Sequence, residues 1–260
     1  MTTNFPTYRL TATSLLTPAD VARIQALGEP PQRIARYGVI RSEGSSDRSV
    51  YFLLEGWVAA SMLLWDGERQ IVKLHLPGDM LGSTSMCFDS AVDTVTALTP
   101  AVVSRIPLER IGALMMTSPA IAVTMLLAAQ EERTVLMDRL AAVGRASALA
   151  RVAALLIELS DRLHRIGHGD DDGFDLALTQ EQIGDLLALT PVHVNRMLRQ
   201  LQELGLVARR GRRVRLIDPS ALRRLAAVRP RTVSTDVSWL GRDMQPVAIP
   251  PVNGDGPLRR

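Results

Sequence analysis

The sequence predicts an α+β protein with an N-terminal antiparallel β-roll (jelly roll), a long dimerisation helix and a C-terminal winged helix-turn-helix. Three observations support this fold class. Short apolar runs separated by turn residues fill positions 34–106, a pattern typical of a small antiparallel barrel. A long helical pattern follows Pro119. Two short capped helices and an arginine-tipped hairpin occupy positions 178–217.

Residues 1–29 are expected to form a lead-in with one helix over 18–27, which Thr17 caps. Residues 30–117 are assigned to the β-roll. Asp66-Gly67 lies between two alternating apolar runs, and this dipeptide favours a tight hairpin. The expected strands cover 50–54, 57–64 and 70–76, with 92–99 and 101–106 as the closing pair.

Residues 118–145 are assigned to one long helix with a stripe of side chains at helical spacing. Placed between two domains, such a helix favours a homodimer seam, although the stripe could instead cover the barrel. The predicted interface residues are Ile121, Met125, Ala128, Glu132, Val135, Leu136 and Arg139.

Residues 146–227 are assigned to the winged helix-turn-helix. An amphipathic helix over 146–163 and a polar loop over 164–173 precede it. Thr179 with Gln182 forms a capping-box pattern that opens the first helix of the pair. Thr190-Pro191 opens the second helix, and Gly205 ends it.

The second helix has one apolar and one polar face. Val194, Met197, Leu198 and Leu201 are expected in the core, which leaves His193, Asn195, Arg196 and Arg199 largely on the opposite side. Such a face can enter a major groove, where Asn and Arg side chains pair with base edges.

The hairpin after the second helix carries arginines at its tip, over 209–213, and these are expected to contact phosphates. Positions 190–229 hold ten arginines and two acidic residues, a net charge of +8, whereas the whole chain carries +3. A basic region this concentrated predicts a nucleic-acid interface.

Composition excludes several classes of protein. Cys87 is the sole cysteine, so an internal disulfide and a multi-cysteine iron–sulfur cluster are both excluded. No apolar run is long enough to cross a bilayer, and the N-terminus has no secretory pattern, so the cytoplasm is the expected location. No cofactor or metal is predicted. Residues 228–260, rich in proline, are expected to be largely disordered.

The order of these parts resembles the Crp/Fnr family of bacterial transcription regulators. The residues that carry the resemblance are YFLLEGWV at 51–58, WDGERQIVKLHLPGDMLG at 65–82 and ALT at 97–99. In the C-terminal half, the resemblance is carried by LTQEQIGDLLALTPVHVNRMLRQLQELGLV at 178–207 and RLIDPSALRRL at 215–225. The resemblance covers about residues 30–227, and it implies a cyclic-nucleotide-binding-like roll and a homodimer on palindromic double-stranded DNA.

The family's motif assigns roles to residues of the second helix. By resemblance, Arg196 reads guanine, and Thr190 and Thr179 contact phosphate. Val192 stands where the family often has glutamate, so it could touch only a thymine methyl. The full predicted DNA-binding set is Thr179, Thr190, Val192, His193, Asn195, Arg196, Arg199, Arg210, Arg212 and Arg213.

The roll departs from the members that bind cyclic AMP. The glutamate expected to hold the ribose is replaced by Ser83, and no arginine occurs between Arg69 and Arg105 to hold the phosphate. Control by cyclic AMP is therefore not expected, and the effector is unknown.

Four residues suggest other sensors. His75 and Cys87 lie where haem-sensing relatives carry ligands, but we interpret His75 as a surface residue and Cys87 as a small core residue. His164 and His168 are interpreted as part of a solvated loop, not as metal ligands.

The predicted function is therefore sequence-specific transcription regulation, with RNA polymerase as a further partner if the protein activates. The alternative is a small-molecule or redox sensor that acts through protein contact and uses the helix-turn-helix for docking. No catalytic constellation supports an enzyme.

Overall fold

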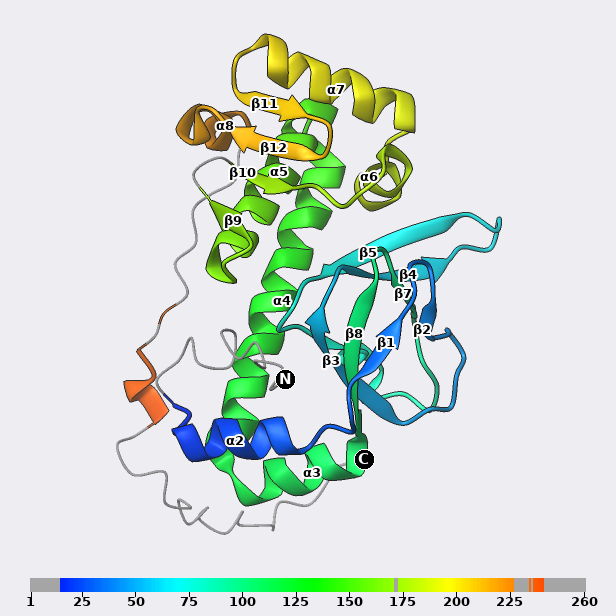
Figure 1. Cartoon of the computed structure of the whole chain (residues 1–260), viewed down its shortest axis with the longest axis vertical. Coiled ribbons are helices and arrows are strands. Elements are labelled where there is room, and N and C mark those ends of the chain that lie inside the picture. The colour runs from blue at the N-terminus through cyan, green and yellow to red at the C-terminus, as the bar shows by residue number, and fades with distance from the viewer. Residues whose placement is uncertain (1–14, 171–172, 227–233, 235, 241–260) are drawn as a thin grey trace, which may run out of the picture.

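The computed structural model describes residues 15–170, 173–226, 234 and 236–240. The helix α4 (Pro119–Arg145) runs along the long axis of the molecule (Figure 1). A β-roll lies beside it, and the helix-turn-helix unit lies at one end, far from α2 and α3. Most of the tail expected to be disordered, 228–260, lies outside the described residues. The α+β fold class is confirmed.

The β-roll consists of two four-stranded antiparallel sheets with the orders β1-β8-β3-β6 and β2-β7-β4-β5. The closing pair predicted at 92–99 and 101–106 is wrong as a pair, because β7 and β8 belong to opposite sheets. A turn at Pro100 redirects the chain between them. The strands are β1 (Gln32–Ile34), β2 (Val39–Arg41), β3 (Ser49–Glu55), β4 (Val58–Leu63), β5 (Arg69–His75), β6 (Met80–Leu81), β7 (Thr94–Ala97) and β8 (Ala101–Pro107). A short 3-10 turn, η1 (Ser83–Ser85), follows β6.

Helices close one end of the roll. The predicted Thr17 cap is confirmed at the start of α2 (Pro18–Ala26), where Thr17 and Asp20 form a capping box. Ile24 of α2 packs with Ile111 of α3 (Leu108–Thr117) and with Ile121 of α4 in one apolar cluster. The beginning of α4 is thereby fixed to the roll.

The stripe predicted as a dimer seam faces the roll for most of its length. Ile121 is buried, and Met125 packs against the same cluster. Glu132 pairs with Lys73 of β5 at 2.5 Å, and Arg139 donates to the Val72 carbonyl at 3.1 Å. For these residues the alternative, that the stripe covers the barrel, is correct. Of the remaining members Ala128 is half-buried, while Val135 and Leu136 keep more than a third of their surface exposed.

The C-terminal unit surrounds α5 (Ala148–Arg165). Its sheet has the order β11-β12-β10-β9, with β9 (Gly169–Asp170), β10 (Gly173–Asp175), β11 (Val207–Arg210) and β12 (Arg213–Leu216). The polar loop predicted over 164–173 is thus partly wrong, because Gly169 and Asp170 pair with Phe174 and Gly173. The helices are α6 (Gln180–Leu187), α7 (Pro191–Glu203) and α8 (Pro219–Ala226), and a short η2 (Ser238–Leu240) follows.

The helix-turn-helix unit and the roll share one apolar core. Trp57, Ile71 and Leu74 of the roll belong to the same buried cluster as Leu156 and Leu159 of α5. Among the described residues, no single helix is long and apolar enough to span a membrane. The pair α3–α4 reaches the length and apolar composition of a span only when the two helices are taken together, and they are bent by 118° relative to each other.

Candidate nucleic-acid interface

The turn between α6 and α7 is tight for local reasons. Thr179 accepts from the Gln182 amide at 3.1 Å while the Gln182 side chain accepts from the Thr179 amide at 2.9 Å, which confirms the predicted capping box. A Cβ on Gly184 would lie 2.4 Å from the Leu189 carbonyl oxygen, so only glycine allows this approach. Ala188 ends α6 with φ +53°, a left-handed cap that turns the chain toward α7.

The two faces of α7 separate as the sequence predicts. Val194, Met197, Leu198 and Leu201 are buried in the shared core. The opposite face carries the side chains predicted to read DNA. Val192 is 79% exposed, His193, Arg196 and Arg199 are exposed, and Asn195 is half-buried. Figure 1 shows α7 at the extreme end of the molecule, where a duplex can approach it.

The start of α7 is held by Thr190 and His193. Thr190 Oγ1 accepts from the His193 amide at 3.3 Å and lies 3.2 Å from His193 Nδ1. Pro191 fills the first helical position, where its missing amide hydrogen leaves no bond unmade. This arrangement leaves the exposed beginning of α7 ordered, and its open amides form a site that favours phosphate.

The wing is a hairpin of β11 and β12 whose turn contains only Gly211 and Arg212. The predicted five-residue tip is therefore too long, because Arg209 and Arg210 pair with Val214 and Arg213 in the ladder. Gly211 has φ +59°, the left-handed geometry that two-residue hairpin turns need.

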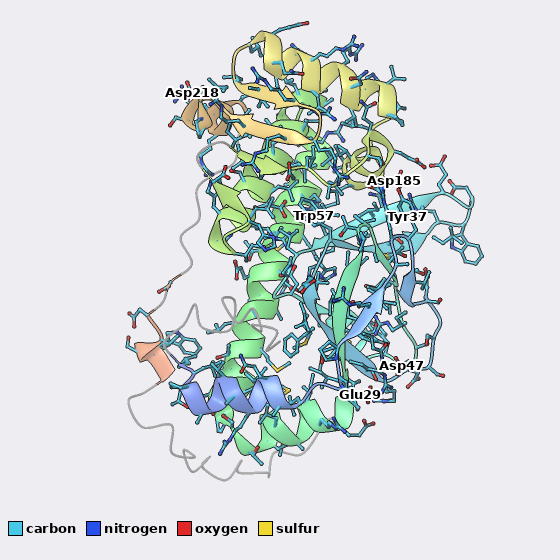
Figure 2. The ribbon with its side chains drawn as sticks, in the orientation of Figure 1. Glu29, Tyr37, Asp47, Trp57, Asp185 and Asp218 are labelled. Atoms are coloured by element: carbon cyan, nitrogen blue, oxygen red, sulfur yellow. The ribbon has the colours of Figure 1, made fainter. Side chains whose placement is uncertain are left out.

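The arginines of this unit differ in their surroundings. Arg213 pairs with Asp170 of β9, and Arg223 pairs with Asp161 of α5 at 2.7 Å. Arg196, Arg210 and Arg212 form no ion pair with any residue that the structure describes, and all three are exposed. Arg199 and Arg215 share this condition. The charges available to a polyanion therefore lie on α7 and along the wing. Side chains of this unit project outward in Figure 2.

A second exposed surface lies on α4, beside the stripe that covers the roll. Its members recur with alternating spacings of three and four residues, the period of a coiled-coil seam. We call this surface the α4 seam. Leu140 is 75% exposed and Leu126 is 54% exposed. The α4 seam comprises Leu126, Ala129, Arg133, Leu136, Leu140 and Val143.

The interior of the roll holds a buried ion pair that sequence reasoning missed. Arg41, at the end of β2, donates to Asp93 Oδ1 at 2.9 Å and to Ser85 Oγ at 2.8 Å. Asp93 Oδ2 accepts from Thr84 Oγ1 at 3.1 Å. Arg41 also lies 3.4 Å from the Gly82 carbonyl oxygen, and a Cβ at Gly82 would collide with its guanidinium. An arginine on a short strand, 52 residues from its partner, gives no local signal.

The residues considered for other sensors take unexpected places. His75 was predicted at the surface, but it is buried with Nδ1 3.7 Å from Asp79 Oδ2. Cys87 was predicted in the core, but it is exposed. His164 contacts the carbonyls of Ser160 and Asp170. In the part of the chain that the structure describes, no three His, Cys, Asp or Glu side chains gather as metal ligands would.

Comparison with known proteins matches both halves of the chain. Residues 31–118 match the family model of the cyclic nucleotide-binding domain, and residues 150–225 match that of the Crp-like helix-turn-helix domain. The transcriptional activatory protein AadR of Rhodopseudomonas palustris is 32% identical over 82% of this chain and 87% of its own. The nitrogen fixation regulation protein FixK of Rhizobium meliloti is 30% identical over 75% of this chain and 88% of its own. The structure of FixK2 from Bradyrhizobium japonicum is 27% identical, has a TM-score of 0.71, and covers 77% of this chain and 98% of its own.

Proposed function

The chain belongs to the Crp/Fnr family of transcription regulators, and on that premise we propose that it binds a palindromic DNA site as a homodimer without cyclic AMP. The observation that carries the proposal is the exposed polar face of α7, flanked by the wing, where Arg210, Arg212 and Arg215 are exposed and form no ion pair with any described residue. RNA polymerase becomes a second partner if the protein is an activator. The cytoplasm, where the chromosome lies, is the proposed compartment.

On DNA, Arg196 makes the main base contact, since a guanidinium pairs bidentately with guanine in the major groove. His193 and Asn195 add contacts at neighbouring bases, and Val192 meets a thymine methyl. The phosphate contacts come from Thr179, Thr190, Arg199, Arg210 and Arg212. Arg213 is the weakest member of the predicted set, because Asp170 already neutralises it.

Dimerisation uses the α4 seam. Leu136 belongs to both the predicted interface and this seam, whereas Ile121, Met125, Glu132 and Arg139 are occupied within the chain. A second copy of α4 buries the leucines of the seam, as apolar residues at coiled-coil spacing require. The two recognition helices of such a dimer face half-sites about one helical turn, or roughly 10 base pairs, apart.

The interior of the roll supports the proposed independence from cyclic AMP. A bound cyclic nucleotide needs donors for its phosphate, and the charged donor in this interior, Arg41, is committed to Asp93 and Ser85. Recruiting it would leave the Asp93 carboxylate buried without its cation, which is costly. The roll therefore needs no nucleotide to satisfy its buried charges.

The proposal is tested by fluorescence anisotropy on the DNA that the protein selects. The affinity should fall steeply as salt rises, and Arg196→Ala should abolish discrimination between the selected site and a scrambled one. Cyclic AMP should change neither the affinity nor the thermal unfolding midpoint. Salt-insensitive association with another protein, with no DNA binding, would instead support the docking alternative.

A further inference from the structure

The helix-turn-helix unit is fixed to the roll by more than its covalent link. Between α4 and α5 the chain is extended at Ala146 and Ser147, and these two residues form the only connection between the helices in sequence. Such a link alone leaves the unit free to rotate. In the structure, however, α5 and α6 both contact β5 of the roll.

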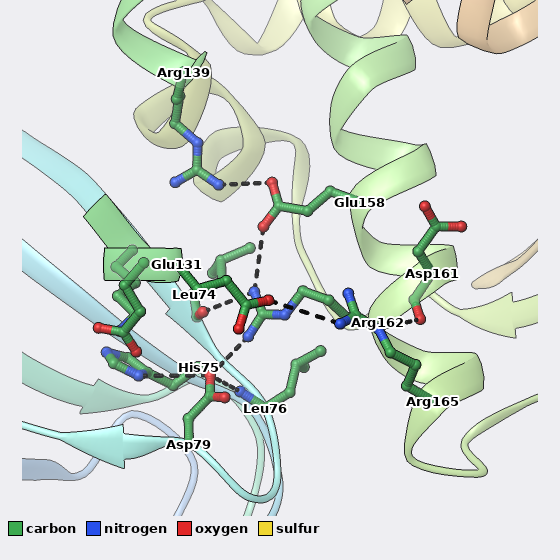
Figure 3. Close-up of polar contacts among 12 residues, drawn as sticks. Leu74, His75, Leu76, Asp79, Glu131, Arg139, Glu158, Asp161, Arg162 and Arg165 are labelled. Atoms are coloured by element: carbon green, nitrogen blue, oxygen red, sulfur yellow. Dashed lines mark hydrogen bonds and ion pairs between the residues drawn. The ribbon is translucent and has the colours of Figure 1, made fainter. Parts of the chain in front are cut away.

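A buried polar cluster joins α5 to the roll (Figure 3). Arg162 of α5 donates to Asp79 Oδ2 at 2.7 Å and to the Leu74 carbonyl at 3.1 Å. Arg162 also donates to Glu158 Oε1 at 3.3 Å. The other carboxylate oxygen of Glu158, Oε2, accepts from Arg139 of α4 at 2.9 Å. We call Asp79, Arg139, Glu158 and Arg162 the interdomain clasp. It ties three segments together: the turn after β5, the C-terminal part of α4 and the C-terminal half of α5.

The clasp contributes more to the relative orientation of the two units than to the net stability of the fold. Asp79 is completely buried and Arg162 is 7% exposed, so both groups lose their hydration. A buried ion pair adds little net stability, but removing one partner leaves a charge without compensation, so rotations that separate the pair are disfavoured. Burial alone would raise the pKa of Glu158, but the nearby charges of Arg139 and Arg162 hold it below its usual value. Glu158 is therefore charged at neutral pH.

A second contact fixes the other side of the unit. Arg69 of β5 pairs with Asp185 of α6 at 2.7 Å, and the Gln70 side chain donates to the Asp185 carbonyl. Figure 2 shows Asp185 where α6 meets the β4–β5 hairpin. Since the tight turn at Ala188 joins α6 to α7, fixing α5 and α6 on β5 also fixes the direction of the recognition helix relative to α4.

We propose that the interdomain clasp, with Arg162 as its central positioning residue, sets the angle between α7 and the α4 seam and thereby the half-site spacing that the dimer accepts. The DNA part of this inference rests on the proposed function. The docking part does not, because it concerns only how one chain holds its own two units.

The docking part is tested without DNA. Cys87 on the roll and an introduced cysteine at the exposed Gln202 on α7 carry spin labels, and doubly labelled chains are diluted with unlabelled protein. Pulsed dipolar spectroscopy should give one narrow distance distribution, which Arg162→Met broadens. Arg165→Gln is the matched control, because Arg165 on the same helix is exposed: it donates to the Asp161 carbonyl of its own helix at 3.3 Å and lies 3.8 Å from Glu131 of α4. A distribution unchanged by Arg162→Met overturns the proposal.

The DNA part compares duplexes that carry one half-site with palindromes of different spacing. Arg162→Met should bind the best palindrome about tenfold more weakly, because a loosely held second unit has a lower effective concentration at its half-site. Binding to one half-site should stay within about twofold of the wild type, and the preference for the best spacing over spacings one base pair longer or shorter should shrink. Unchanged palindrome affinity and spacing preference would overturn the positioning role.

A second variant and the wild-type selection result separate failure of the clasp from failure of the proposed function. Asp79→Asn removes the same charge pair from the roll side, so it replaces Arg162→Met if that variant unfolds. If the wild type selects no palindrome, the proposed function fails together with the spacing role. The spin-label distances would still decide whether the clasp fixes the unit.

Discussion

Replacing Leu140 by glutamate should separate the dimer. Leu140 is 75% exposed in the single chain, and we propose that the partner's α4 covers it. Burying a whole leucine side chain contributes about 2 kcal/mol, so the exposed part contributes about 1.5 kcal/mol per chain and about 3 kcal/mol per dimer. Each 1.4 kcal/mol is a factor of ten, so losing the apolar contact alone weakens association about 100-fold, and a desolvated carboxylate weakens it further.

The assay is sedimentation equilibrium, followed by anisotropy on the selected palindrome. Leu140→Glu should be monomeric at concentrations where the wild type is dimeric, and it should bind the palindrome no better than a single half-site. Met116→Glu is the matched control, because Met116 is 86% exposed on α3, outside the α4 seam. Leu140→Glu that remains as dimeric as the wild type would refute the seam.

Three other predictions concern the DNA face, the roll and acid stability. Arg196→Ala should lose discrimination between sites, whereas Arg210→Ala should weaken binding to all sequences and reduce the slope of log affinity against log salt by about one, as anisotropy titrations would show. Arg41→Leu should lower the free energy of unfolding by about 3–5 kcal/mol in urea titrations, because the Asp93 carboxylate stays buried without its partner. A decrease of under about 1 kcal/mol, as expected for an exposed ion pair, would contradict the buried pair. Because the folded-state pKa of Glu158 is lowered, its stabilisation is fully present above its ordinary pKa and is lost as pH falls through the folded value. The melting temperature should therefore decrease as the pH falls below about 4.5, and this decrease should be smaller in Glu158→Gln than in the wild type.

Local patterns in the sequence predict the local structure of the helix-turn-helix well. The caps at Thr179 and Thr190 and the buried residues of α7 all follow from contacts within a few positions of the chain. The sequence also predicts the wing, but its turn is shorter than expected, because the pairing of β11 with β12 continues to Arg210 and Arg213. The DNA-binding roles themselves stay predictions.

What the sequence does not reveal depends on pairs far apart in the chain. Helical spacing alone shows that α4 has a stripe, but it cannot show which face the roll covers, so Glu132 and Arg139 were assigned to the wrong partner. Arg41 with Asp93 and Arg162 with Asp79 are joined only by the tertiary fold. For the same reason, the burial of His75 and the exposure of Cys87 were predicted the wrong way round.

The most direct test of the central claim is to select DNA from a randomised pool with the purified protein, without any added nucleotide, and to sequence the bound fraction. The account predicts a palindromic motif with half-sites about one helical turn, or roughly 10 base pairs, apart. Within each half-site, the base read by Arg196 should lose its preference in Arg196→Ala. A pool without enrichment at moderate salt, or one enriched for a motif without two-fold symmetry, would contradict a dimer that binds DNA without an effector.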